Sequence, residues 1–161
     1  MPRVVAVDWG LRRIGLAVSD PLGILASGLP TLEVRSEAEA VSRVADTVRE
    51  VEAESLVVGL PLHLSGARGD SAVAAERFAR LLRDATGLPV FLYDERLTSA
   101  IAQRRMHETG ERTRGRKGKL DQGAAIALLE GWLAKLKYQK ADDAQGNKPR
   151  GGQEPQEPED R

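Results

Sequence analysis

The sequence predicts a single mixed α/β domain, with a five-stranded sheet covered by helices on both faces. Two observations support this. Strand-like segments fill the first 34 residues, and two later apolar runs each follow an amphipathic helical pattern. Strands that arrive through helices are typical of parallel crossovers, whereas consecutive strands joined by short turns pair antiparallel. We therefore expect a three-stranded antiparallel meander followed by two parallel crossover strands. The chain has 161 residues, of which 41% are hydrophobic, and this is enough for one core.

The three leading strands are predicted from their apolar patterns and turn residues. Arg3–Val7 is a buried strand because Val, Val, Ala and Val follow one another without a polar residue. Gly15–Ser19 is its expected hairpin partner across a glycine-containing turn. A third strand falls within Leu25–Val34, where Gly28 and Pro30 interrupt the pattern and favour an edge position.

The next segments alternate between helix and strand. Ser36 can cap a first helix, and Ser55–Gly59 is a short apolar run typical of a buried strand. Asp70 can cap a second helix, which Gly87 ends before a strand at Val90–Tyr93. The predicted apolar face of the first helix consists of Val41, Val44, Ala45, Val48 and Val51, and that of the second consists of Ala74, Phe78, Leu81, Leu82 and Ala85.

The last third of the chain contains two predicted helices and a tail. A short helix is expected at Ala100–Glu108, with Thr98 or Ser99 as its cap, and a strong one at Leu120–Tyr138. Residues 1–140 form the predicted domain. Residues 141–161 are rich in Gly, Pro, Gln and acids without aliphatic anchors, which predicts a disordered acidic tail.

Composition excludes several kinds of protein. The chain has no cysteine, so disulfides and thiolate metal sites are excluded, and any metal would bind oxygen ligands. No signal peptide or stretch long enough for a membrane span is visible, so we expect a cytoplasmic protein. The formal net charge is zero, so overall charge gives no reason to expect binding to nucleic acid.

Acidic residues stand at the ends of three predicted elements. Asp8 follows the first strand, the pair Asp94 and Glu95 follows the last strand, and Asp121 lies in the first turn of the last helix. The carboxyl ends of parallel strands meet at one edge of a sheet, where ligands of open α/β sheets bind. Converging carboxylates repel one another, and Mg²⁺ or Mn²⁺ bound between them would relieve this repulsion.

Each of these acids also has a plainer interpretation. Asp8 could simply form the turn before Gly10, and Asp121 could be a helix N-cap. One acid of the adjacent pair could be solvated or could pair with Arg96.

A basic segment leads into Asp121. Residues 104–119 carry seven Lys or Arg residues against two Glu residues, whereas residues 141–161 carry six acidic and three basic residues. A basic patch beside a metal site is suited to phosphate-rich polymers, although a solvated charge run is the alternative. Because Lys and Arg contact the phosphate backbone without reading bases, we expect selectivity for nucleic-acid shape rather than sequence.

Four ordered motifs within residues 3–138 resemble the YqgF/RuvX family. Its members are bacterial RNase H-like proteins, described as Holliday junction resolvases and as nucleases that mature the 5′ end of pre-16S rRNA. The motifs are residues 8–17, residues 57–61 with Gly66, residues 94–99, and Asp121 with Ala124, Ala125, Leu128 and Leu129.

The resemblance implies an RNase H-like fold in which Asp8, Glu95 and Asp121 hold Mg²⁺ or Mn²⁺ and carry out catalysis. By the family pattern Glu95 is favoured over Asp94. Gly123 is less typical of the family helix, and the tail after Tyr138 lies outside the resemblance. The expected contacts to the phosphate backbone come from Arg12, Arg116, Lys117 and Lys119.

The expected function is therefore that of a metal-dependent endonuclease acting on structured nucleic acid, such as precursor rRNA or four-way junction DNA. Symmetric cleavage of a junction would require a homodimer, whereas an RNA processor could act as a monomer. Two alternatives are a catalytically silent RNA- or DNA-binding module in ribosome assembly and an actin-like ATPase or kinase domain. The second shares the Asp-x-Gly loop of residues 8–10 but needs two such domains.

Overall fold

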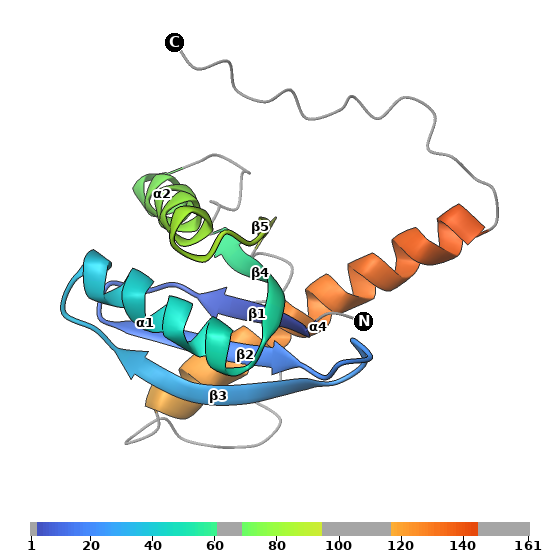
Figure 1. Ribbon diagram of the computed structural model, residues 1–161, viewed down its shortest axis with the longest axis horizontal. Helices are drawn as coiled ribbons and strands as arrows, with labels where there is room; N and C mark the ends of the chain where they lie inside the picture. The colour runs from blue at the N-terminus through green and yellow to red at the C-terminus, as the bar shows by residue number, and fades with distance from the viewer. Residues whose placement is uncertain (1–2, 61–68, 95–116, 145–161) are drawn as a thin grey trace, which may run out of the picture.

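A computed structural model of the chain describes residues 3–60, 69–94 and 117–144, and within the last range it describes the side chains of residues 122–142. The strands are β1 (Arg3–Asp8), β2 (Arg13–Ser19), β3 (Ala26–Glu33), β4 (Ala53–Leu60) and β5 (Val90–Asp94). The helices are α1 (Glu37–Glu50), α2 (Asp70–Thr86) and α4 (Lys117–Ala144). Figure 1 shows α1 and α2 on one face of the sheet and α4 crossing the other.

The sheet has the order β3-β2-β1-β4-β5, with β1 at its centre. β1 and β2 pair antiparallel, as do β2 and β3, whereas β4 pairs parallel to both β1 and β5. This confirms the predicted meander with two parallel crossover strands. β3 is an edge strand, as its glycine and proline predicted, and its pairing with β2 is irregular between Ile14 and Leu16.

Alternating side chains of the sheet form two separate cores. Val5 and Val7 of β1 pack with Phe78 and the apolar faces of α1 and α2. Val4 and Ala6 point to the opposite face and pack under α4. β1 is apolar at every position from 4 to 7 because both of its faces are covered, as is typical of a central strand in an α/β sheet.

The helix ends confirm two of the predicted caps and correct a third. Ser36 accepts a hydrogen bond from the Glu39 backbone N–H at 3.1 Å, and Gly87 ends α2 in the left-handed conformation with φ of 69°. The prediction that Asp70 caps α2 is wrong, because Gly69 is the N-cap and Asp70 is the first helical residue. The carboxylate of Asp70 still lies at the positive end of the helix dipole.

The predicted apolar face of α2 is also partly wrong. Phe78 and Leu82 are fully buried as predicted, but Ala85 is exposed and Ala74 is only half-buried. The buried alanines are Ala72, Ala75 and Ala79. Alanine is small enough to lie on either side of a helix, so hydrophobicity alone did not identify which alanines face the sheet.

The last helix is longer than the sequence predicted. α4 begins at Lys117 instead of Leu120 and continues to Ala144, so residues 141–144 belong to the helix and not to the tail. The short helix predicted at residues 100–108 and the remaining tail lie outside the described residues. Within the described part of the chain, no helix is both long and apolar enough to span a membrane.

Candidate active site

Asp8 is the last residue of the central strand. Its backbone lies opposite Gly15 of β2, and the preceding residue, Val7, pairs with Val58 of β4. Side chains alternate between the two faces of a strand, and Val4 and Ala6 pack under α4. Asp8 continues this set, so its half-buried side chain belongs to the face that α4 covers.

The turn after Asp8 is fixed by several independent contacts. Trp9 packs on the opposite face against Phe78, with ring centroids 6.1 Å apart. A Cβ atom at Gly10 would lie 2.6 Å from the carbonyl oxygen of Arg13, so only glycine fits there. The carbonyl of Arg12 accepts a hydrogen bond of 2.9 Å from the backbone N–H of Val34. These contacts hold the backbone that follows Asp8, and the side chain of Arg12 is exposed in this turn.

The carboxyl ends of β4 and β5 lie at this edge too. Gly59 pairs with Tyr93, and Leu60 pairs with Asp94. Tyr93 faces Trp132 of α4, whereas Val90 belongs to the core under α1 and α2. Asp94 is four residues after Val90 and therefore lies on the same face of β5, which is the face of α1 and α2. Asp8 lies on the opposite face, which α4 covers. Glu95, the residue that the family resemblance favours, lies outside the described residues.

The start of α4 lies level with the end of β1. The side-chain amide of Gln122 donates a hydrogen bond of 2.8 Å to the carbonyl of Leu29 on β3. Leu29 pairs with Leu16, and Leu16 pairs with Val7, so this contact is in register with the residue before Asp8. Because β2 lies between β3 and β1, the contact of Gln122 with β3 is about two strand spacings, or about 10 Å, from β1. Position 121 precedes Gln122 and lies one helical turn before the fully buried Ala125.

A close backbone approach allows this docking. A Cβ atom at Gly28 of β3 would lie 3.3 Å from Cδ1 of Ile126 and 3.4 Å from Cδ of Gln122. Glycine therefore lets the first turns of α4 come close to β3, and this contact positions the helix that carries residue 121.

The three-carboxylate site itself remains a prediction. Among the residues whose side chains the structure describes, no three His, Cys, Asp or Glu residues could together hold a metal ion. The side chains of Asp121, Lys117 and Lys119 are not among them, and Arg116 lies outside the described backbone. The described donor is a carboxylate at a strand end in a protein without cysteine, which fits a divalent cation that prefers oxygen ligands.

The sequence analysis missed a group of aromatic residues near the carboxyl ends of β1, β4 and β5. Phe91 and Tyr93 of β5 both contact Trp132 of α4. The available signal was the alternation of aromatic residues at positions 91 and 93, which places both rings on one face of the strand.

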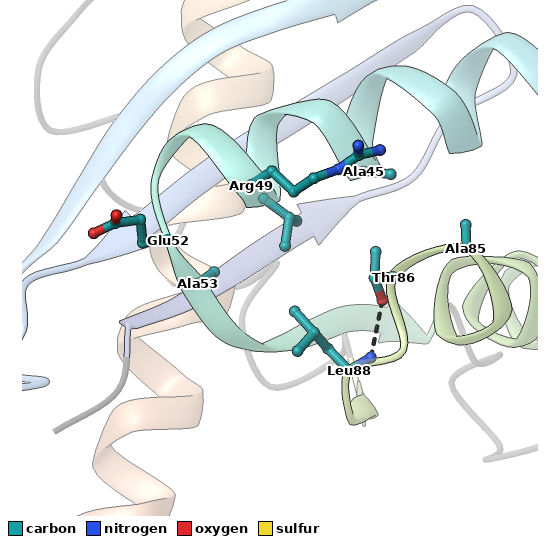
Figure 2. Close-up of a pocket in the computed structure, with 8 residues that line it drawn as sticks. Ala45, Arg49, Glu52, Ala53, Ala85, Thr86 and Leu88 are labelled. Carbon is teal, nitrogen blue, oxygen red and sulfur yellow. Dashed lines mark hydrogen bonds between the residues drawn. The ribbon is translucent and has the colours of Figure 1, made fainter.

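A cavity between α1 and α2 lies far from Asp8. It has a volume of about 660 Å³ and is lined by residues that include Arg49, Glu52 and Leu88. Figure 2 shows these side chains beside the hydrogen bond from the Leu88 N–H to the Thr86 hydroxyl. The cavity lies where β4 begins, opposite the end of the sheet that carries Asp8, so it does not belong to the candidate site.

The sheet order β3-β2-β1-β4-β5 and its pairing directions define the fold class as RNase H-like. Solved structures agree on the fold. RuvC of T. thermophilus in complex with a Holliday junction substrate superposes with a TM-score of 0.53 at 20% identity, covering 84% of this chain and 96% of that one. The Fowlpox virus resolvase in complex with Holliday junction DNA gives a TM-score of 0.52 at 9% identity, covering 83% of this chain and 98% of that one.

The chain belongs to the RuvX family, described as Holliday junction resolvase, which matches residues 2–135. A relative from Rhodococcus jostii (strain RHA1), named "Putative pre-16S rRNA nuclease", is 43% identical over 159 residues, covering 94% of this chain and 89% of the relative. One of the same name from Anaeromyxobacter sp. (strain K) is 44% identical over 131 residues, covering 81% of this chain and 96% of the relative. Membership of this family of nucleases confirms the predicted resemblance and decides against the actin-like alternative.

Proposed function

We propose that this protein is a metal-dependent endonuclease that hydrolyses phosphodiester bonds of structured nucleic acid. The main support is the placement of Asp8. This carboxylate ends the central strand on the face covered by α4, and Gln122 near the start of α4 docks on β3 in register with Val7, the residue before Asp8. A carboxylate at the end of a strand, on the face that a helix covers, is suited to binding a cation next to a substrate phosphate.

The proposed ligands of the cation are Asp8, Glu95 and Asp121, and the cation would be Mg²⁺ or Mn²⁺. When bound, such ions polarise the scissile phosphate, activate water and stabilise the leaving oxygen. We propose Glu95 rather than Asp94 as the ligand, because Asp94 lies on the same face of β5 as Val90, which is the face opposite to that of Asp8.

The protein's own cations would hold the substrate. Arg12 is exposed in the turn between β1 and β2, four residues after Asp8. Its guanidinium can bind a phosphate by two parallel hydrogen bonds. Arg116, Lys117 and Lys119 would contact flanking phosphates from the segment that leads into Asp121.

The substrate would be precursor rRNA or four-way junction DNA. The relatives named as pre-16S rRNA nucleases favour the RNA, and an enzyme of precursor rRNA would act in the bacterial cytoplasm. Paired cuts in a junction would require a homodimer with two symmetric sites.

The test is the Asp8→Asn variant. Removing this carboxylate should lower the cleavage rate by at least about 10²–10³-fold, as happens when one electrostatic group is removed from an active site. Substrate affinity should stay the same or rise, because a negative charge next to phosphate is lost. Rates should be measured with Mn²⁺ on precursor rRNA and on four-way junction DNA.

The matched control is Asp84→Asn, which removes an exposed carboxylate from α2, on the other face of the sheet. It should cleave at the wild-type rate. Unchanged turnover by Asp8→Asn would refute the proposed site. Tight binding of both substrates by the wild type without any cleavage would instead establish a silent binding module.

A further inference from the structure

Three aromatic side chains and a lysine form a cluster on the face that carries Asp8. The rings of Phe91 and Trp132 are stacked, with centroids 5.1 Å apart and an interplanar angle of 29°. Tyr93 meets Trp132 edge-on, with centroids 6.0 Å apart. The ammonium group of Lys135 lies 5.4 Å from the centroid of Trp132 and 5.8 Å from that of Tyr93.

The members of this cluster differ in exposure. Trp132 is buried, whereas Phe91 keeps 43% of its surface exposed although one side of its ring is stacked on Trp132. Tyr93 is half-buried and Lys135 is exposed. Phe91 is therefore an aromatic surface that is fixed from behind and open to solvent. A preorganised ring of this kind loses little conformational entropy when a ligand covers it.

The cluster lies within reach of a strand bound at Asp8. Tyr93 pairs with Gly59, and Gly59 follows Val58, which pairs with the residue before Asp8. Tyr93 and Asp8 are thus about two strand spacings apart, about 10 Å, and Phe91 lies about 7 Å back along β5. Because these two directions are perpendicular, Phe91 is about 12 Å from Asp8. At about 3.4 Å per stacked nucleotide, a base on this cluster would be about three to four nucleotides from the scissile phosphate.

We propose that Phe91, with Tyr93 and Trp132 behind it, is a platform on which an unpaired nucleobase of the substrate stacks. This proposal rests on the proposed nuclease function. Aromatic rings bind any base through its π-face, so the platform would select unpaired structure without selecting sequence. Lys135 would neutralise the phosphate next to the stacked base. The platform would thereby position a single-stranded flank and feed the neighbouring phosphates towards Asp8.

Charge favours nucleic acid over a protein partner on this surface. Lys135 is exposed, and its ammonium group lies over the rings of both Trp132 and Tyr93. Sites for single-stranded nucleic acid characteristically combine a positive surface with stacking rings. A hydrophobic protein interface would instead be expected to exclude charge from its centre.

The experiment uses full-length protein and oligonucleotide substrates that carry one 2-aminopurine in an unpaired flank, at one to six nucleotides from the cleaved bond. Stacking should quench the fluorescence of this base at one or two adjacent positions, about three to four nucleotides from that bond. Phe91→Ala should abolish the quenching and weaken binding by about 5- to 140-fold, the range expected for one stacked base. Phe91→Trp should restore both.

Two further variants test the parts separately. Tyr138→Ala removes a ring that is 75% exposed on the same helix and should change neither quenching nor affinity. Lys135→Gln should lower affinity uniformly for all sequences and reduce the salt dependence by about one released counterion.

The proposal would be overturned by equal quenching at every position, or by Phe91→Ala binding the flanked substrate like the wild type. It would also be overturned if Phe91→Ala lowered thermal stability and weakened fully paired substrate to the same extent, since that indicates a structural ring. Each of these results can occur while cleavage still depends on Asp8. Cleavage by Asp8→Asn would instead refute the proposed function.

Discussion

The turn after Asp8 should tolerate no side chain at position 10. A Cβ atom there would lie 2.6 Å from the Arg13 carbonyl oxygen, and real Cβ atoms do not approach closer than 3.0 Å. In Gly10→Ala the backbone must therefore move by at least about 0.4 Å. Neither partner can rotate away, because the obstacle is a main-chain atom at the first residue of β2.

The magnitude follows from what this turn holds. Forcing a methyl group into such a contact typically costs about 1–3 kcal/mol of folding stability. The larger effect should be on catalysis, because a displacement approaching 1 Å at a reacting group can lower the rate by about a hundredfold. Asp8 is only two residues from Gly10 and would shift with the turn. We therefore expect Gly10→Ala to lose about 10- to 100-fold in cleavage rate while remaining folded.

The assay is single-turnover cleavage together with urea unfolding, and Gly123→Ala is the matched control. A Cβ atom at Gly123 would meet nothing within 4 Å, and alanine is favoured over glycine inside a helix by about 1 kcal/mol. The control should be slightly stabilised and should cleave normally. Wild-type stability and cleavage in Gly10→Ala would refute the reasoning that the turn fixes Asp8.

Three more predictions concern the scaffold. Gly28→Val should lower the free energy of unfolding by about 1–3 kcal/mol and also lower the cleavage rate, because the added carbons would push Ile126 and α4 away from β3. Unfolding in urea like that of the wild type would contradict this. Glu52 has a φ of 55° directly after the C-cap of α1, so Glu52→Gly should raise stability by about 1 kcal/mol, and a lower melting temperature would count against strain at this position. Hydrogen bonds from the backbone N–H of Leu25, and also of Ile24, lower the pKa of Asp20 below its ordinary value of 3.8. The contribution of this turn to stability is complete above that value and is lost as the pH falls through the lowered pKa, so the difference in melting temperature between the wild type and Asp20→Asn should shrink on acidification.

Much of the fold could be predicted because local patterns and tertiary structure agree. The uninterrupted run in β1 predicted a strand covered on both faces, and both faces of β1 are buried. Ser36 and Gly87 predicted helix ends because capping depends on neighbouring residues alone. The errors occurred where the choice depends on distant packing. Which alanines of α2 face the sheet is decided by the contacts of the whole helix and not by residue type.

The candidate site could be predicted in part for the same reason. Strand topology brings Asp8 and the end of β5 to one edge, and a sequence that predicts the strands also predicts that edge. The sequence does not predict which face of the sheet each residue occupies, because this depends on the register of the individual strand. β5 continues one residue beyond the predicted Tyr93 to Asp94, and its contacts with Trp132 show which side chains face α4. Those contacts place Asp94 on the face opposite to that of Asp8, and the sequence alone did not show this.

The position of α4 links the stability of the fold to the chemistry of the site. Asp8 comes from the centre of the sheet and Asp121 from a helix more than a hundred residues later, so they can act together only if α4 docks in register. The Gln122 side chain holds the N-terminal part of α4 on β3, while Trp132 packs against the rings of β5 at the other edge of the sheet. The helix thus spans the sheet and is anchored at both edges, which limits sliding and rotation above Asp8. The same contact with β5 that fixes the helix also stacks Phe91 and leaves its outer surface open. One packing interaction would therefore serve both the proposed metal site and the proposed base platform.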